Sequence, residues 1–168
     1  MESLGAQRRA LEEHAHALDR AARDLTRADL ERVAEMARKH DVWVFSDEAY
    51  EDLLYTGEHV SIASLPGMYE RTIPCYTLSK SYAMTGVRVG YFAMKDAAMR
   101  ARATKLVLYT ASNVSSIAQY GAIGALEGSQ QCLEDFRVEL KARRDLFYAG
   151  VREVAPHVFS GNPPEGAF

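Results

Sequence analysis

The feature that most constrains the fold of this chain is a short unbroken apolar run, Val42 to Phe45, directly after a helix-like segment. The run consists of β-branched and aromatic residues, which favour a strand buried on both faces of a parallel sheet. Before it, Thr26 and Asp29 have the spacing of a capping box, which predicts the start of a helix. One apolar stripe then recurs with the helical period: Leu30, Val33, Ala34 and Ala37.

The rest of the chain predicts two more strands followed by helices. Thr72–Thr77 is the second candidate strand, although Pro74 cannot donate to a ladder, and Arg88–Met94 is the third. A helix is expected from Lys95 onward, with a stripe of Met99, Ala103, Leu106 and Val107. Ser115–Leu126 and then a long helix follow, the latter with Leu133, Phe136, Leu140, Phe147 and Val151 on one side and Arg143 and Arg144 exposed. This order predicts an α/β layered domain, with few strands for a complete doubly wound sheet.

Composition and charge exclude several classes of protein. With 48% hydrophobic and 26% charged residues the 168-residue chain is not a disordered one, and a net charge of −3 gives no reason to expect nucleic acid or an anionic membrane as partner. Its first residues lack the apolar core of a signal peptide, so we expect a cytoplasmic protein. Two distant cysteines and scattered histidines form no ligand pattern, and we expect no metal site.

Acidic and aromatic residues follow the first predicted strand directly. The string is Phe45-Ser46-Asp47-Glu48-Ala49-Tyr50. Open α/β sheets take their ligand groups from the carboxyl ends of strands, which places Asp47 and Tyr50 well for binding. The alternative is that Asp47 simply caps the following turn.

Two more strings surround the other predicted strands. Lys80 stands among hydroxyls at a strand end, where a lysine of lowered pKa could form a Schiff base, although a lone lysine is usually a solvated surface charge. Arg88 lies between Gly86 and Gly90, where glycines allow a close backbone approach and a guanidinium suits a phosphate. The alternative for this string is an ordinary turn before a strand.

Together these strings resemble the class I and II aminotransferases, pyridoxal-phosphate (PLP) enzymes of fold type I related to aspartate aminotransferase. The resemblance rests on SDEAYEDLLY, TLSKSYAMTGVRVGY, an SSIAQ…AL segment and RRDLF in this order, and covers about residues 26 to 168. It implies part of that fold's large domain, with a mainly parallel sheet flanked by helices. It also implies amino-group transfer between an amino acid and a 2-oxo acid, and a homodimer in the cytoplasm.

The resemblance implies roles around the reacting part of the cofactor. Lys80 matches the lysine that forms the aldimine with PLP and later moves the proton. Asp47 matches the aspartate that pairs with the pyridine nitrogen and keeps it protonated. Tyr50 matches the tyrosine that hydrogen-bonds the phenolic oxygen of the ring.

A second group of positions matches the family's phosphate-binding residues. Thr77 and Ser79 match the hydroxyls of that site, and Arg88 matches its arginine, at the family's own offset from Lys80. The resemblance further suggests that Ser112 or Asn113 touches the cofactor site of a neighbouring subunit.

Other parts of the family pattern have no match. The Asn-Pro-Thr-Gly motif is absent, and Val87 stands where many relatives have an aromatic residue. We therefore expect an atypical helical stretch over 1–25, a PLP-binding portion of the large domain over 26–155 and the start of a truncated small domain over 156–168. Two alternatives remain open: a non-catalytic truncated remnant with unpaired sheet edges, or a PLP-dependent lyase of the same fold.

Overall fold

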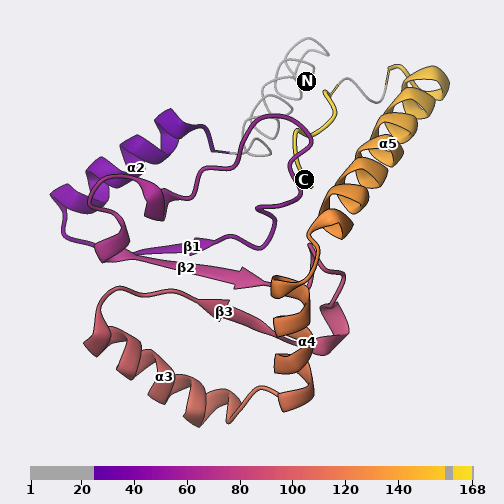
Figure 1. Ribbon diagram of the computed structural model, residues 1–168. Helices are drawn as coiled ribbons and strands as arrows, with labels where there is room; N and C mark the ends of the chain where they lie inside the picture. Colours follow the sequence, from indigo (N-terminus) through magenta and orange to yellow (C-terminus); the bar gives the residue numbers. More distant parts are fainter. Residues whose placement is uncertain (1–24, 158–160, 168) are drawn as a thin grey trace, which may run out of the picture.

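The computed structural model describes residues 25–157 and 161–167 of the chain (Figure 1). The predicted stretch 1–25 lies outside these residues except for its last position. The helices are α2 (Arg27–Lys39), α3 (Ala97–Ala111), α4 (Ser116–Glu127) and α5 (Gln131–Val154). The strands are β1 (Val44–Asp47), β2 (Thr72–Thr77) and β3 (Gly90–Phe92), and the single-turn 3-10 helices are η1 (Ile62–Ser64), η2 (Tyr69–Arg71) and η3 (Thr85–Val87). The predicted α/β order of elements is confirmed.

Helix α2 begins where the capping box predicts. Thr26 Oγ1 accepts a hydrogen bond from the Asp29 N–H at 3.2 Å, and the Asp29 carboxylate accepts one from the Thr26 N–H at 3.0 Å. Two of the helix's otherwise unpaired donors are thereby satisfied. The buried face of α2 consists of Leu30, Ala34 and Ala37, as the stripe predicts, whereas Val33 at its margin is 39% exposed.

The described strands form one sheet in the order β1-β2-β3. β1 and β2 are parallel, with Asp47 opposite Cys75, whereas β2 and β3 are antiparallel, with Thr77 opposite Gly90. In Figure 1, α2 lies on the β1 side of this sheet and α3 on the β3 side. The parallel pair is the part that matters for a site, because its two carboxyl ends meet at one edge.

Pro74 lies inside the central strand, where a proline is unusual. Its carbonyl accepts a hydrogen bond from the Ala93 N–H at 3.1 Å, so this residue faces β3. A paired antiparallel position would also need an N–H from Pro74, which proline lacks. β3 ends at Phe92, one residue before that position, and the shorter strand replaces the longer Arg88–Met94 prediction.

The prediction that Val42 to Phe45 is buried on both faces is wrong. Only Val44 packs towards the core, while Val42 is 49% and Phe45 70% exposed. The reason is that β1 alternates its side chains between two faces, and only the face of Val44 lies on the main core cluster. This cluster consists of Leu30, Ala34, Ala37, Ile62, Leu65 and Met68. The other face of β1 carries Phe45.

The helices predicted after β3 are present, but the exposure of some of their side chains differs from the predictions. In α3 the predicted stripe is not buried, since Leu106 is 63% and Val107 39% exposed. In α5 the prediction that Arg144 is exposed is wrong. Its side chain is only 12% exposed, and its guanidinium carbon lies 4.7 Å from the centroid of the Tyr55 ring. An arginine that stacks on an aromatic face gives up little hydration for that contact.

The C-terminal segment 161–167 docks against the loop that follows β1. Arg144 donates to the Pro164 carbonyl, and the N–H groups of Tyr55 and Thr56 both donate to the Glu165 carbonyl, at 2.7 and 3.2 Å. These bonds connect α5, the end of the described chain and the β1 loop.

Candidate functional site

The two parallel strands end beside each other, and polar side chains follow both ends. Asp47 is the last residue of β1 and Thr77 the last residue of β2. Ligand sites of open α/β sheets lie at this edge, outside the carboxyl ends of the strands.

Asp47 is exposed at this edge and takes part in the turn after β1. Its Oδ1 accepts a hydrogen bond from the Ala49 N–H at 3.1 Å, so Asp47 does cap the following turn. That bond occupies one side of one carboxylate oxygen, and a carboxylate can accept several more hydrogen bonds. Turn capping and ligand binding are therefore compatible.

Lys80 and Tyr50 come from different loops and meet at the same edge. The Lys80 Nζ lies 5.3 Å from the centroid of the Tyr50 ring, a cation–π distance. The Lys80 side chain is half-buried, and its carbonyl accepts the Ala83 N–H at 3.1 Å in a turn that gives Ala83 a positive φ of 53°. The amine is held against an aromatic ring, unlike a solvated surface charge.

A chain of hydrogen bonds connects the other predicted residues. Thr77 Oγ1 donates to Ser79 Oγ at 2.9 Å and accepts from the Ser79 N–H at 3.2 Å. Thr85 Oγ1 donates to the Ser79 carbonyl at 2.9 Å, and Arg88 Nη1 donates to the Thr85 carbonyl at 3.0 Å. Thr85 thus connects the loop that carries Ser79 to Arg88, although no motif gave it a separate role.

Arg88 is held by an unusual backbone as well as by its side chain. It closes η3 with a φ of 58°, in the left-handed region that costs a non-glycine residue about 1 kcal/mol or more. Two residues later, a Cβ added at Gly90 would lie 2.5 Å from the Tyr76 carbonyl oxygen. The string around Arg88 therefore does form a turn before a strand, as the alternative predicts. This turn also fixes the position of the Arg88 backbone, from which the guanidinium extends.

Sequence reasoning missed the most buried charged group next to the site. Glu48 is 5% exposed, and its Oε1 accepts from Ser46 Oγ at 2.9 Å and from Ser61 Oγ at 2.7 Å. His59 Nε2 lies 2.8 Å from its other oxygen. Burial opposes ionisation, but the hydrogen bonds from His59, Ser61 and Ser46 outweigh it and lower the pKa of Glu48. The signal was present, since side-chain alternation from Val44 puts Glu48 on the core face.

Two titratable groups near Glu48 have raised pKa values, which favour their neutral forms. Burial and then the charge of Asp52 raise the pKa of Glu51. Burial, then the charges of Asp47 and Glu48, raise the pKa of the Cys75 thiol. Cys75 therefore stays a thiol near neutral pH, which does not suit a nucleophile.

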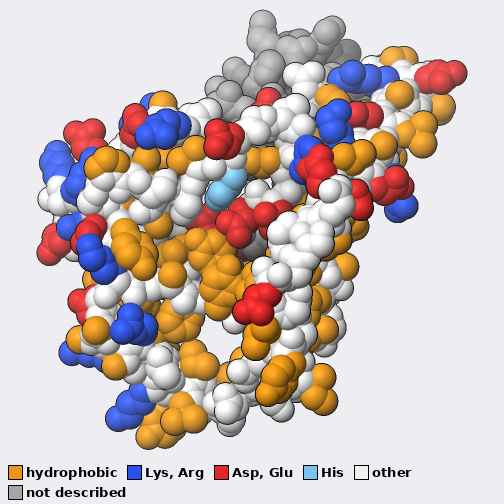
Figure 2. Space-filling model, in the orientation of Figure 1, with side chains coloured by type: hydrophobic (Ala, Val, Ile, Leu, Met, Phe, Trp, Pro, Cys, Tyr) orange, Lys and Arg blue, Asp and Glu red, His pale blue; other side chains and the backbone are white. Residues whose placement is uncertain are grey.

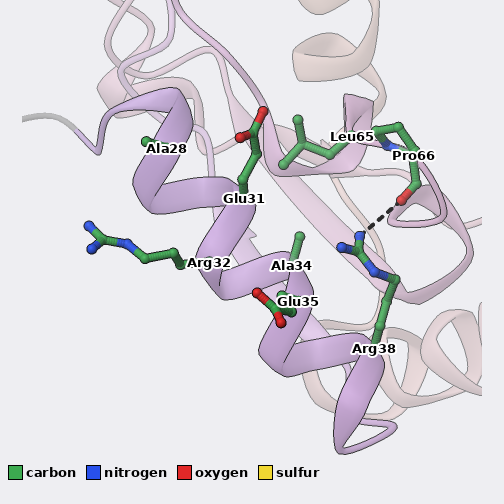
Figure 3. A pocket seen from close by; sticks show the side chains of 8 residues that line it. All are labelled: Ala28, Glu31, Arg32, Ala34, Glu35, Arg38, Leu65 and Pro66. Carbon is green, nitrogen blue, oxygen red and sulfur yellow. Dashed lines mark hydrogen bonds between the residues drawn. The ribbon is translucent and has the colours of Figure 1, made fainter.

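A separate hollow of about 670 Å³ lies between α2 and the segment of Leu65 and Pro66 (Figure 3). It is lined by Ala28, Glu31, Arg32, Ala34, Glu35, Arg38, Leu65 and Pro66. Its charges are mixed in sign and partly satisfied, because Glu31 pairs with Arg27 and Arg38 donates to the Pro66 carbonyl at 3.1 Å. None of the predicted site residues lines it, so the strand edge is the better candidate.

Some predicted features lie apart from this edge. Ser112 ends α3 with a φ of 61°, and Asn113 follows it, and their contact with a neighbouring subunit stays a prediction. Within residues 25–157 and 161–167, His, Cys, Asp and Glu form no group of three or more that could hold a metal ion. None of the helices in the described part of the chain has the length and apolar character that a membrane crossing requires.

Comparison with protein families gives one match that spans most of the chain. The profile described as aminotransferase class I and II matches residues 21–168. An aspartate aminotransferase of Bacillus subtilis is 41% identical over 145 residues, which are 85% of this chain and 36% of that protein. An arginine–pyruvate transaminase of Pseudomonas aeruginosa is 46% identical over 122 residues, or 73% of this chain and 31% of that protein.

Solved structures agree with these relatives. The crystal structure of an aromatic aminotransferase from Pyrococcus horikoshii superposes with a TM-score of 0.79 at 37% identity, covering 88% of this chain and 39% of that one. A Thermus thermophilus aspartate aminotransferase variant gives a TM-score of 0.77 at 32% identity, covering 88% of this chain and 38% of that one. The chain thus spans between 31% and 39% of the length of these four proteins.

Proposed function

Because this chain belongs to the class I and II aminotransferase family, we propose that it provides the PLP-binding part of an aminotransferase. The reaction is the transfer of an amino group between an amino acid and a 2-oxo acid. The observation that carries this proposal is the contact of Lys80 with the Tyr50 ring at the edge where the parallel strands end, the edge at which Asp47 closes β1.

The donor set at this edge fits PLP. Two hydroxyls, of Thr77 and Ser79, and the guanidinium of Arg88 suit a phosphate, which prefers charge-assisted and bidentate hydrogen bonds. Only one N–H of the guanidinium is directed at the Thr85 carbonyl, and an arginine has five. An exposed carboxylate at Asp47 suits a protonated ring nitrogen, and the Tyr50 hydroxyl suits the phenolic oxygen of the ring.

Each of these side chains has a distinct task. Bound PLP supplies a ring that withdraws electrons from the substrate. Asp47 holds the proton on the ring nitrogen by its negative charge. Lys80 is the point of covalent attachment and holds or moves a proton at Nζ. The aromatic ring of Tyr50 restricts where that amine can go.

A PLP titration of the purified chain tests the proposal. We expect a visible absorbance band that the wild type develops and Lys80→Ala does not. Lys105→Ala is the matched control, because Lys105 is an exposed lysine of α3, away from the strand edge. Borohydride reduction followed by peptide mass mapping should place the pyridoxyl group on Lys80.

The outcomes separate the alternatives that the sequence left open. Equal bands in the wild type and Lys80→Ala would refute the attachment point and favour a non-catalytic remnant. If mapping places the label on Lys80, adding an amino acid to unreduced, PLP-loaded protein should yield one equivalent of 2-oxo acid without turnover, the amino group staying on the cofactor. A product of elimination in its place would point to a lyase.

Two further properties concern assembly and location. We propose a homodimer, supported by exposed apolar side chains on α3 and α4 such as Tyr109, Ile117 and Tyr120, which are 76%, 84% and 77% exposed. Sedimentation velocity tests this proposal. A cytoplasmic location stays a prediction from the sequence.

A further inference from the structure

We propose that Glu48 is a positioning residue for Asp47, fixing the carboxylate that the proposed function assigns to the ring nitrogen. The proposal rests on that function for its purpose, but its geometry is independent of it. Glu48 is adjacent to Asp47 in sequence and is anchored by both its backbone and its side chain.

The backbone anchor extends the sheet past Asp47. The Glu48 N–H donates to the Cys75 carbonyl at 2.9 Å, one step beyond the last paired residue of β1. Asp47 is thus held between ladder positions on both sides. Because successive side chains of an extended strand point to opposite faces, burying Glu48 directs Asp47 to the open face.

The side-chain anchor ties this point to a second segment. Ser61 donates to Glu48 at 2.7 Å and also accepts the Ala63 N–H at 3.3 Å, which caps η1. Its neighbour Ile62 is 3% exposed and belongs to the main core cluster. The Glu48 carboxylate is therefore fastened to a packed part of the molecule, not to a loose loop.

The negative charge of this segment explains why the buried Glu48 carboxylate needs a hydrogen-bond donor such as His59. Two adjacent carboxylates would repel each other, and Glu51 and Asp52 add further negative charge near by. His59 Nε2, 2.8 Å from Glu48, supplies a donor that becomes a compensating cation when protonated. Figure 2 shows acidic side chains and a histidine gathered near the middle of this face. With Glu48 so paired, Asp47 is the carboxylate left facing the open side.

Amide hydrogen exchange without PLP tests the geometric half of the proposal. We expect the amides of 48–50 to exchange about tenfold faster in Glu48→Ala, with a smaller effect in Glu48→Gln, which keeps an acceptor for both serines. Glu58→Gln is the matched control, an exposed glutamate of the same loop. Unchanged exchange at 48–50, or equal acceleration in α4, would overturn the proposal.

A double-mutant cycle on PLP affinity tests the functional half. Glu48→Ala should raise the Kd about tenfold in the wild-type background and Glu48→Gln should raise it less, while neither should have an effect in Asp47→Asn, because Glu48 acts through Asp47. Equal weakening in both backgrounds would mean a merely structural role and would overturn the proposal. If the wild type shows no Lys80-dependent band, the proposed function fails, while hydrogen exchange still decides whether Glu48 holds this segment.

Discussion

The main core cluster can be tested by comparing two methionines in one protein. Met68 is 0% exposed and lies among α2, η1 and η2, whereas Met36 is 63% exposed on α2 itself. Truncating each to alanine removes the same atoms. At Met68 the loss combines the transfer free energy of a buried methionine, about 1.5–3 kcal/mol, with a cavity contribution, giving about 2–5 kcal/mol.

At Met36 the same change should alter the free energy of unfolding by about 0.5 kcal/mol or less, since little surface is buried and alanine favours a helix. Urea unfolding followed by far-UV circular dichroism measures the difference. With a slope of about 2 kcal/mol per M, the midpoint of Met68→Ala should fall by about 1–2.5 M while that of Met36→Ala hardly moves. Similar midpoints for the two variants would refute the assignment of the core to this cluster.

Three other changes should have measurable effects. Gly90→Ala should destabilise the fold by about 1–3 kcal/mol because its Cβ would meet the Tyr76 carbonyl, whereas Gly86→Ala, with nothing within 4 Å, should not; thermal unfolding compares them. Lowering the pH should destabilise the fold through Glu48. Its folded pKa lies below its ordinary value of 4.5, so its contribution is complete above that value and lost as the pH falls through the folded one. Urea titrations from about pH 6 to about pH 3 should show a smaller loss in Glu48→Gln. Thr26→Ala should cost about 1 kcal/mol by removing the cap of α2, with a matching loss of helical signal on mild heating.

The order and type of the elements could be predicted from local sequence. The capping box at Thr26 and the helical stripe of α2 depend on contacts three or four residues apart, which a sequence displays directly. β2 was predicted with its observed bounds despite Pro74, because β-branched and aromatic residues dominate it. For the site, Asp47 and Lys80 were candidates because they follow predicted strands and Arg88 because it lies between glycines, and the resemblance supplied their roles.

Local sequence could not predict which residues far apart in the chain come into contact. The exposure of Phe45 follows from its place on the face of β1 opposite the main core cluster, and which elements cover a face of a sheet is a long-range property. Arg144 was predicted to be exposed because arginines usually are, and its stack on Tyr55 depends on a partner far along the chain. The burial of Glu48 could have been predicted from the alternation of side chains along β1, but its partners His59 and Ser61 could not, because they belong to another segment.

The bonds from Tyr55 and Thr56 to Glu165 have a consequence for the order in which this chain folds. The strands that form the candidate site pair with partners close to them in the sequence. The two bonds to Glu165, in contrast, close a loop of more than half the chain. Forming a contact across a long loop requires a larger loss of chain entropy, so such contacts form late and open first. The segment 161–167 should therefore join an already formed strand edge, and its release should leave that edge intact.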